Sequence, residues 1–166
     1  GVTSKDVILQ IIGKIGTAGG TGYVIEYAGD LISNLSVENR MTICNMTIEG
    51  GARAGLIQPD QKVFDYLKDK PMSPKKDNWE KALEYWNNLK SDEGAHFDKE
   101  INLDGQDIKP MVTWGTSPQD VVTIDGKVPN PKNEIDPDKK NSIERSLKYM
   151  GLNSDVLVQD IKIDKV

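Results

Sequence analysis

The sequence predicts an α/β protein, in which helices alternate with short strands. Three observations support this prediction. Several segments repeat apolar residues every three to four positions, which is the spacing of a helix with one buried face. Between these segments lie short runs rich in β-branched and aromatic residues, bounded by glycine, proline or aspartate. The length of 166 residues is that of about one domain.

The first helix is predicted to begin at the capping residue Thr3, with Asp6 three residues later completing a capping-box pattern. Its helical stripe consists of five apolar residues: Val7, Ile8, Ile11, Ile12 and Ile15. The glycine-rich run 16–22 ends this helix. The β-branched and aromatic segment 23–27 then predicts a strand, followed by a turn at residues 29–30.

A second helix is predicted to start after Ser36, which can cap it with Asn39 at the third position. Glu38 lies in its first turn, where a negative charge suits the helix dipole. We expect one side of this helix to carry Met41, Cys44 and Ile48. The glycines at 50 and 51 weaken its end.

The central segments predict a short buried strand at residues 56–57 and a short helix capped by Asp60, with Val63, Phe64 and Leu67 on it. The composition of residues 70–77 predicts a linker. Residues 79–89 predict an amphipathic helix, because four apolar residues recur there at helical spacing: Trp79, Leu83, Trp86 and Leu89.

The part of the chain from residue 97 onward predicts four more strands and one helix. Residues 97–103 alternate between apolar and polar, as in a strand, and residues 108–114 and 121–124 predict a strand pair. An irregular loop is expected near 125–137. A helix over 138–150 ends at Gly151, a typical C-cap residue, and residues 158–166 predict a last strand.

Charge and cysteine content exclude several classes of partner and site. The net charge of −5, without a basic block, argues against a nucleic acid or an anionic membrane as partner. No apolar run reaches the ~20 residues that span a membrane, and the start is unlike a signal peptide. The single cysteine, Cys44, excludes an intrachain disulfide and a multi-cysteine metal site. A reducing, cytoplasmic location is expected.

Two polar side chains on the helix after Ser36 are the candidates for chemistry. Asn45 and Glu49 are four residues apart, so on an α-helix they lie on one face, about one turn apart. A carboxylate and a carboxamide presented together can hold a hydroxylated acidic substrate or a metal-bound water. A helix with two exposed polar residues and no function has the same spacing.

Other reactive residue types have structural interpretations. Cys44 is expected to be a buried, unreactive thiol, and the single histidine, His96, a surface residue. The glycine run 16–22 resembles a phosphate-binding loop, but its order of helix, glycines and strand places no helix N-terminus at an anion. Three tryptophans are expected to be core or interface anchors: Trp79, Trp86 and Trp114.

Several segments, in order along nearly the whole chain, resemble the aconitase superfamily. The run Thr-Ile-Cys-Asn-Met at residues 42–46, with Glu49 after it, is similar to an active-site run of that family. Further segments resemble its entry sequence, its Gly-Gly-Thr-Gly motif and its isopropylmalate isomerase branch: 1–8, 19–27, 51–60, 85–94 and 112–118.

This resemblance implies the three-layer α/β/α fold of the cluster-bearing part of such enzymes, with residues 1–166 as a partial, internal segment. It implies a hydro-lyase whose [4Fe–4S] cluster binds substrate through one iron, and which isomerises 2-isopropylmalate to 3-isopropylmalate in leucine biosynthesis. By position, Asn45 would hydrogen-bond near the cluster, and Glu49 would hold the iron-bound hydroxyl or water. The implied partners are the rest of the large subunit, a small swivelling subunit and a hydroxy-dicarboxylate substrate.

The sequence also departs from the family. The first cluster cysteine of the family follows an Asp-Lys-Val segment; here Asp164-Lys-Val166 is last, and the later Cys-x-x-Cys ligands are missing. Cys44 does not align with a cluster ligand. We therefore expect residues 1–166 to be an internal piece that has no metal ligands or cluster of its own and is inactive alone. Two alternatives remain open: a non-enzymatic binding or assembly domain, and a family member acting on homoaconitate or citrate.

Overall fold

The computed structural model describes residues 1–165 and has the predicted α/β class. In chain order, the α-helices and strands are α1 (Ser4–Ile15), β1 (Val24–Glu26), α2 (Asp30–Asn34), α3 (Val37–Met46), β2 (Ala54–Leu56), α4 (Gln61–Leu67), α5 (Asp77–Asn87), β3 (Met111–Thr113), β4 (Val121–Thr123) and α6 (Pro137–Met150). Four short 3-10 helices occur between or after them: η1 (Thr47–Gly50), η2 (Gly105–Asp107), η3 (Pro131–Asn133) and η4 (Val158–Asp160).

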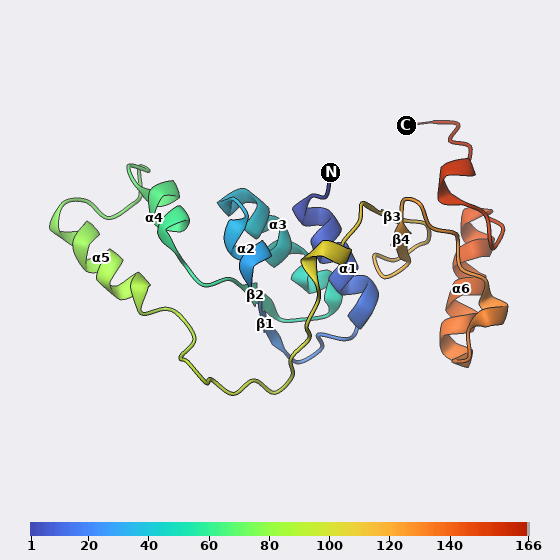
Figure 1. Ribbon diagram of the computed structural model, residues 1–166, viewed down its shortest axis with the longest axis horizontal. Coiled ribbons are helices and arrows are strands. Elements are labelled where there is room, and N and C mark those ends of the chain that lie inside the picture. Colours follow the sequence, from blue (N-terminus) through green and yellow to red (C-terminus); the bar gives the residue numbers. More distant parts are fainter. Residues whose placement is uncertain (166) are drawn as a thin grey trace.

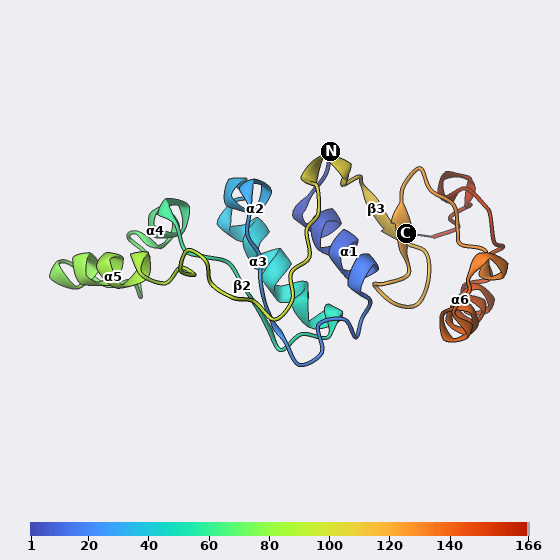
Figure 2. The same cartoon turned by 60° about the horizontal axis from the view of Figure 1, so that its bottom comes forward.

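Figures 1 and 2 show an elongated molecule with three parts in a row. The centre is formed by α1, α2, α3 and the two strands β1 and β2. At one end α4 and α5 extend away from this centre, and at the other end lie α6 and the C-terminal segment. The β3–β4 pair lies between α1 and α6 (Figure 1).

The hydrophobic core lies where α1 packs against α3. Ile8 and Ile12 of α1 and Ile43 of α3 are fully buried. Tyr27, directly after β1, and Ile108, directly after η2, belong to the same cluster. Burial of each isoleucine side chain contributes about 1.5–3 kcal/mol. The stripe that the sequence predicts on α1 is therefore the main apolar face of the molecule.

The start of α1 is fixed by one carboxylate, as the capping-box pattern predicts. The backbone N–H and the hydroxyl of Thr3 both donate to Asp6 Oδ2 at 2.7 Å, and the Met111 N–H donates to Asp6 Oδ1 at 2.8 Å. Burial pushes the pKa of Asp6 upward, but the hydrogen bonds from Met111 and Thr3 outweigh it and lower the pKa below its ordinary 3.8. Asp6 thus joins the cap of α1 to β3, more than a hundred residues along the chain.

The strands form two separate two-stranded sheets. β1 and β2 are parallel, with Ile25 opposite Gly55, whereas β3 and β4 are antiparallel, with Val112 opposite Val122. The predicted strand pair of residues 108–114 and 121–124 is confirmed, within shorter bounds. A three-layer α/β/α arrangement is only partly present in residues 1–165, because α3 packs on one face of a sheet of two strands.

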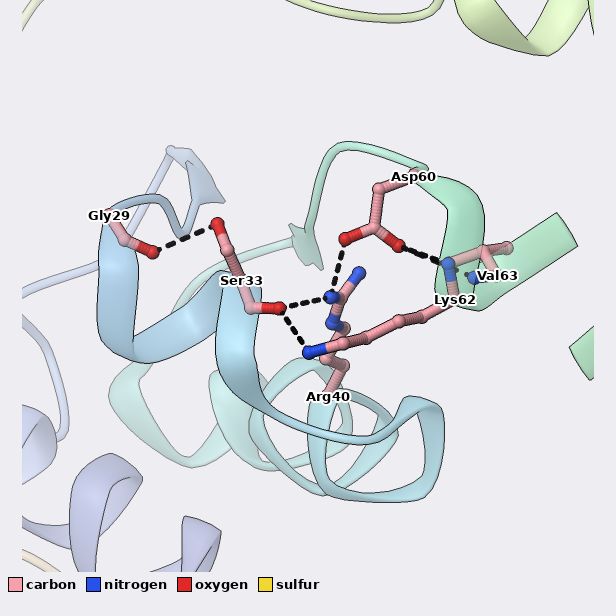
Figure 3. Close-up of polar contacts among 6 residues, drawn as sticks. All are labelled: Gly29, Ser33, Arg40, Asp60, Lys62 and Val63. Carbon is pink, nitrogen blue, oxygen red and sulfur yellow. Dashed lines mark hydrogen bonds and ion pairs between the residues drawn. The ribbon is translucent and has the colours of Figure 1, made fainter. Parts of the chain in front are cut away.

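A buried arginine connects α3 to the end of α2 and the start of α4 (Figure 3). Nη2 of Arg40 donates to the Ser33 carbonyl at 2.8 Å and to Asp60 Oδ2 at 2.6 Å. The other carboxylate oxygen of Asp60 accepts from the N–H groups of Lys62 and Val63, so this residue also caps α4, as predicted. Nε and Nη1 of Arg40 are buried without a partner among residues 1–165. The hydrogen bond to Arg40 lowers the pKa of Asp60.

The helix over residues 79–89 is confirmed as α5, and its tryptophans make the aromatic contacts of this end of the molecule. The Trp86 ring stacks on Phe64 of α4 at 6.0 Å between centroids, and Trp79 meets Trp86 edge-on at 5.8 Å. Neither tryptophan is fully buried. Trp114, by contrast, is a core residue beside β3.

The last helix is confirmed as α6 and ends in left-handed conformation at Gly151. It is attached through Ser146, whose hydroxyl donates to the buried carboxylate of Asp120 at 3.0 Å. The same oxygen of Asp120 accepts the Thr116 N–H at 3.0 Å. A Cβ at Gly115 would collide with Asp120, so this close approach requires glycine.

Three predictions of secondary structure are wrong. Residues 97–103 form no strand and are mostly exposed, since no neighbouring strand pairs with them. Residues 158–165 contain the 3-10 helix η4 and no strand; Val166 lies outside the described residues. The turn expected at residues 29–30 is instead the start of α2, with Gly29 at a φ of 102° before it.

We expect Asp6→Ala to lower the free energy of unfolding by about 2 kcal/mol at neutral pH, because three donors lose their acceptor. The lowered pKa means that folding favours the charged carboxylate. The difference in stability from the wild type should be complete above the unfolded pKa and shrink as pH falls below 3.8. Chemical denaturation between pH 7 and pH 2 measures this, with Asp98→Ala in an exposed loop as control. A difference that stays constant down to pH 2 would contradict the assignment.

Asp60→Asn retains a capping oxygen but loses the charge paired with Arg40, so we expect a loss of about 2 kcal/mol. Asp60→Ala removes the cap as well and should cost about 1 kcal/mol more. The matched control is Asp125→Asn, which breaks the exposed ion pair with Lys109 and should cost much less, because solvent screens an exposed pair. Equal losses for Asp60→Asn and Asp125→Asn in urea denaturation would show that burial of Arg40 is unimportant.

Candidate active site

The structure places Asn45 in the last turn of α3 and Glu49 in the 3-10 helix η1. The change of helix type has a local cause at Thr47. Its hydroxyl donates to the Ile43 carbonyl at 2.9 Å, which is the acceptor that its own N–H would use in an α-helix. The Thr47 N–H bonds to the Cys44 carbonyl instead, and this closer spacing starts η1.

The prediction that Asn45 and Glu49 share one α-helical face is therefore wrong in its geometry. On a continuous α-helix the two side chains would point roughly 40° apart around the axis. A 3-10 turn advances about 120° per residue, which widens this angle to roughly 90°. Both residues are exposed.

The exposed side of α3 is partly apolar. Met41 is 50% exposed and Ile48 is 66% exposed, so the apolar side predicted from Met41, Cys44 and Ile48 is not the buried one. The buried residues are Arg40, Ile43 and Thr47. The sequence pattern did not identify the buried side of α3. Two of the three residues on that side are an arginine and a threonine, and a hydrophobic pattern does not predict that such residues are buried.

Thr47 also connects the segment of Asn45 and Glu49 to the core. Its hydroxyl lies 2.9 Å from the Tyr27 hydroxyl, and both residues are buried. Burial raises the pKa of Tyr27. A Cβ at Gly55 of β2 would collide with the Thr47 side chain, so the strand passes directly over this residue.

The glycine run 16–22 contacts the C-terminal end of η1, the 3-10 helix that carries Glu49. The N–H of Gly20 donates to the Gly50 carbonyl at 2.8 Å, at the end of η1. Gly51 adopts a φ of 85°, and a Cβ there would come within 2.6 Å of the Thr17 carbonyl oxygen. Gly16 and Gly22 have positive φ, as expected of a tight reversal. Helix, glycines and strand follow in the predicted order, and the bond from Gly20 to Gly50 holds the run against the segment of Glu49.

The side chains of Asn45 and Glu49 make no hydrogen bond to other residues in the described part of the chain. The side-chain bonds of this segment come from other positions: Asn39, Arg40, Thr42 and Thr47. An exposed carboxylate and carboxamide without internal partners are available to a ligand. They can accept a hydrogen bond from a hydroxyl or water and donate one to a carboxylate.

The remaining candidates have structural or surface positions. Cys44 is half-buried, and burial raises the pKa of its thiol, which disfavours the nucleophilic thiolate. His96 is exposed in a loop. A cleft of about 610 Å³ lies between α1 and the segment 102–111, away from Asn45 and Glu49.

The donor chemistry of this chain does not fit an iron–sulfur cluster. A cubane cluster needs several thiolates, and the sequence has one cysteine. Within residues 1–165 no three side chains of the histidine, cysteine, aspartate or glutamate type are grouped to hold a metal ion. No helix in the same range is long and apolar enough to cross a lipid bilayer.

The comparison with known families agrees with the resemblance of the individual segments. A sequence model of the aconitase family, described as aconitase family (aconitate hydratase), matches residues 1–166. The matched range includes the core helices, the glycine run and the segment of Asn45 and Glu49.

Because Asn45 and Glu49 have no internal partners, we expect Asn45→Ala and Glu49→Gln each to change the free energy of unfolding by less than about 0.5 kcal/mol. Thr47→Val keeps the shape but leaves the buried Tyr27 hydroxyl without this partner, and should cost about 2 kcal/mol. Thermal and urea denaturation of the three variants test this. A large loss for Asn45→Ala or Glu49→Gln would mean that these residues stabilise the fold.

Proposed function

The chain belongs to the aconitase family of hydro-lyases, and we propose from this premise that it is part of the large subunit of a 3-isopropylmalate dehydratase. Such an enzyme isomerises 2-isopropylmalate to 3-isopropylmalate in leucine biosynthesis, in the cytoplasm. The proposal is supported by the family match along the whole chain. Segments 51–60, 85–94 and 112–118, which resemble the isopropylmalate isomerase branch, favour this substrate within the family.

The single observation that carries the proposal is that the family's Asn and Glu positions are exposed and unengaged here. Asn45 and Glu49 lie at the surface, while residues around them are anchored: Thr47 below and Gly51 beside them. Buried polar groups use their hydrogen bonds within the chain, whereas these two exposed side chains stay open to a ligand. Rigid support with free polar groups is the arrangement that a binding site requires.

The roles of the two side chains follow from their chemistry. Dehydration removes a hydroxyl group from one carbon and a proton from its neighbour, and rehydration returns both with the positions exchanged. The Glu49 carboxylate accepts a hydrogen bond from the departing hydroxyl or from water, and holds that oxygen while the double bond exists. The Asn45 amide donates to a substrate carboxylate or hydroxyl and so fixes its orientation.

The rest of the catalytic site belongs to other parts of the enzyme. A [4Fe–4S] cluster would supply Lewis-acid chemistry, but its thiolate ligands are not among the residues of this chain. The other partners in the proposal are the remainder of the large subunit and a small subunit that closes over the substrate. Residues 1–166 alone are therefore proposed to be inactive.

Homoaconitate and citrate are the competing substrates within the same family. 2-Isopropylmalate and citrate are hydroxy acids, and homoaconitate is an alkene that becomes one when water is added. All three carry several carboxylates, so Asn45 and Glu49 serve them equally. Steady-state kinetics of the assembled enzyme with each compound distinguishes the three substrates. The proposal requires the highest kcat/KM for 2-isopropylmalate. A higher value for citrate or homoaconitate would change the proposed substrate but not the hydro-lyase class.

In the complete, cluster-loaded enzyme we expect Glu49→Gln to lower kcat by about 10³-fold or more, since the amide keeps the shape but loses the charge that holds the hydroxyl. The matched control is Glu38→Gln, an exposed glutamate in the first turn of α3, which should retain normal turnover. Cluster content, from iron analysis and absorption, should be the same in both variants and the wild type. Near-normal turnover of Glu49→Gln would refute the assigned role.

A further inference from the structure

Two buried hydroxyl groups lie between the core and the segment that carries Glu49. Oγ1 of Thr47 lies 2.9 Å from the Tyr27 hydroxyl and 2.9 Å from the Ile43 carbonyl oxygen. A threonine hydroxyl has one proton to donate, and a carbonyl only accepts. Thr47 therefore donates to Ile43, and Tyr27 donates to Thr47. The two hydrogen bonds form a directed chain from Tyr27, directly after β1, into the last turn of α3.

The groups in this chain of hydrogen bonds are fixed by their surroundings. Thr47 is 1% exposed, and Ile43 is fully buried. Burial raises the pKa of Tyr27, so its hydroxyl stays protonated and is a donor at neutral pH. Gly55 of β2 lies so close to Oγ1 of Thr47 that a Cβ on this glycine would collide with it. Tyr27 and β2 thus confine the Thr47 side chain.

A second threonine of α3 shows why the donor from Tyr27 matters. Thr42 also donates its hydroxyl to the carbonyl four residues earlier, that of Glu38, but at 3.2 Å. Thr42 is only partly buried, and the α-helix continues past it. At Thr47 the backbone N–H bonds to the Cys44 carbonyl instead, and η1 begins. The difference between the two threonines is the buried hydroxyl of Tyr27, which reinforces the bond at Thr47.

The change of helix type sets the direction of the Glu49 side chain. The C-terminal end of η1 is held separately, because the Gly20 N–H donates to the Gly50 carbonyl at 2.8 Å. The Glu49 side chain has no hydrogen bond to other residues in the described part of the chain, so its direction depends on the backbone. On a continuous α-helix this side chain would be turned by roughly 50° relative to Asn45.

We propose that Tyr27 and Thr47 are positioning residues for the reaction: their chain of hydrogen bonds imposes the 3-10 turn and so directs the Glu49 carboxylate. The inference rests on the proposed function, because it takes Glu49 as the group that holds the departing oxygen. Both residues are buried, so they act only through the backbone that joins Thr47 to Glu49. Asn45 precedes the change of helix type, so its direction does not depend on them.

Steady-state kinetics of the complete, cluster-loaded enzyme tests the proposal. Thr47→Val keeps the shape but removes the hydroxyl, and we expect kcat to fall about 100-fold, as for other displaced catalytic groups. KM should change less than about threefold, because the contacts of Asn45 are retained. Thr47→Ser keeps the hydroxyl and should keep kcat near that of the wild type. An equally low kcat in Thr47→Ser would overturn the proposal.

Thr42→Val is the matched control for these variants. It removes the same kind of bond, from a hydroxyl to the carbonyl four residues earlier, at a partly buried position of the same helix. We expect its kcat to equal that of the wild type. Iron content should be the same in all variants. A fall in kcat for Thr42→Val as large as that for Thr47→Val would overturn the proposal, since the hydroxyl of Tyr27 would then be irrelevant.

A double variant separates positioning from stability. Thr47→Val alone leaves the buried Tyr27 hydroxyl unpaired, so part of its effect is a loss of stability. Tyr27→Phe combined with Thr47→Val removes both hydroxyl groups, and the urea midpoint should return toward that of the wild type. The low kcat should persist, because the chain of hydrogen bonds is still missing. Recovery of kcat together with the midpoint would overturn the proposal, since both residues would then serve the fold alone.

Crystal structures of the variant enzymes give a readout that does not use turnover. In Thr47→Val and in Tyr27→Phe, the N–H of residue 47 should donate to the Ile43 carbonyl, as in an α-helix. Tyr27→Phe leaves no buried donor unpaired, so it gives this answer even where Thr47→Val fails to fold. An unchanged bond to the Cys44 carbonyl in Tyr27→Phe would overturn the proposal.

This proposal and the proposed function fail in different ways. Near-normal turnover of Glu49→Gln would remove the role of Glu49, whereas the crystal structures would still decide whether the two hydroxyl groups set the turn. A large loss of turnover for Glu49→Gln, together with a normal kcat for Thr47→Val, would overturn the positioning role and leave the proposed function in place.

Discussion

The buried hydroxyl of Thr47 joins the three elements on which the centre of the molecule depends. It bonds to the Ile43 carbonyl in α3 and to the Tyr27 hydroxyl just after β1, while Gly55 of β2 passes over it. One polar side chain thus fixes the distance between the helix and both strands. It also ends the α-helix one turn before Glu49, so the orientation of that carboxylate is a result of core packing.

The features that the sequence predicted well are those decided within a few residues. The caps at Thr3, Ser36 and Asp60 and the left-handed end at Gly151 are all present, because each depends on a side chain and the adjacent backbone. The strand predicted at residues 97–103 is absent because alternation alone supplies no neighbouring strand. Strand formation depends on distant partners, and no pattern in a single segment reports them.

The same distinction applies to the candidate site. The family resemblance of the surrounding run selected Asn45 and Glu49, because their spacing is also that of a helix without function. These side chains are exposed and have no hydrogen bond to other residues in the described part of the chain. The burial of Arg40 and the exposure of Met41 and Ile48 were not foreseen, since Arg40 is held by Asp60 and Ser33 from other segments. Long-range polar contacts decided which side of α3 faces inward, and hydrophobicity alone ranked the two sides wrongly.

The elongated molecule exposes 11688 Å², whereas a compact monomer of its mass exposes about 8,200 Å². This large accessible surface affects how the isolated chain unfolds. An unfolded chain of this mass exposes about 27,000 Å², so the area gained on unfolding is about a fifth smaller than for a compact domain of equal length. Denaturant sensitivity and the heat-capacity increment both scale with that area. Compared with a compact domain of the same length, the chain by itself would therefore unfold over a broader range of urea concentration. Its free energy of unfolding would also vary less steeply with temperature.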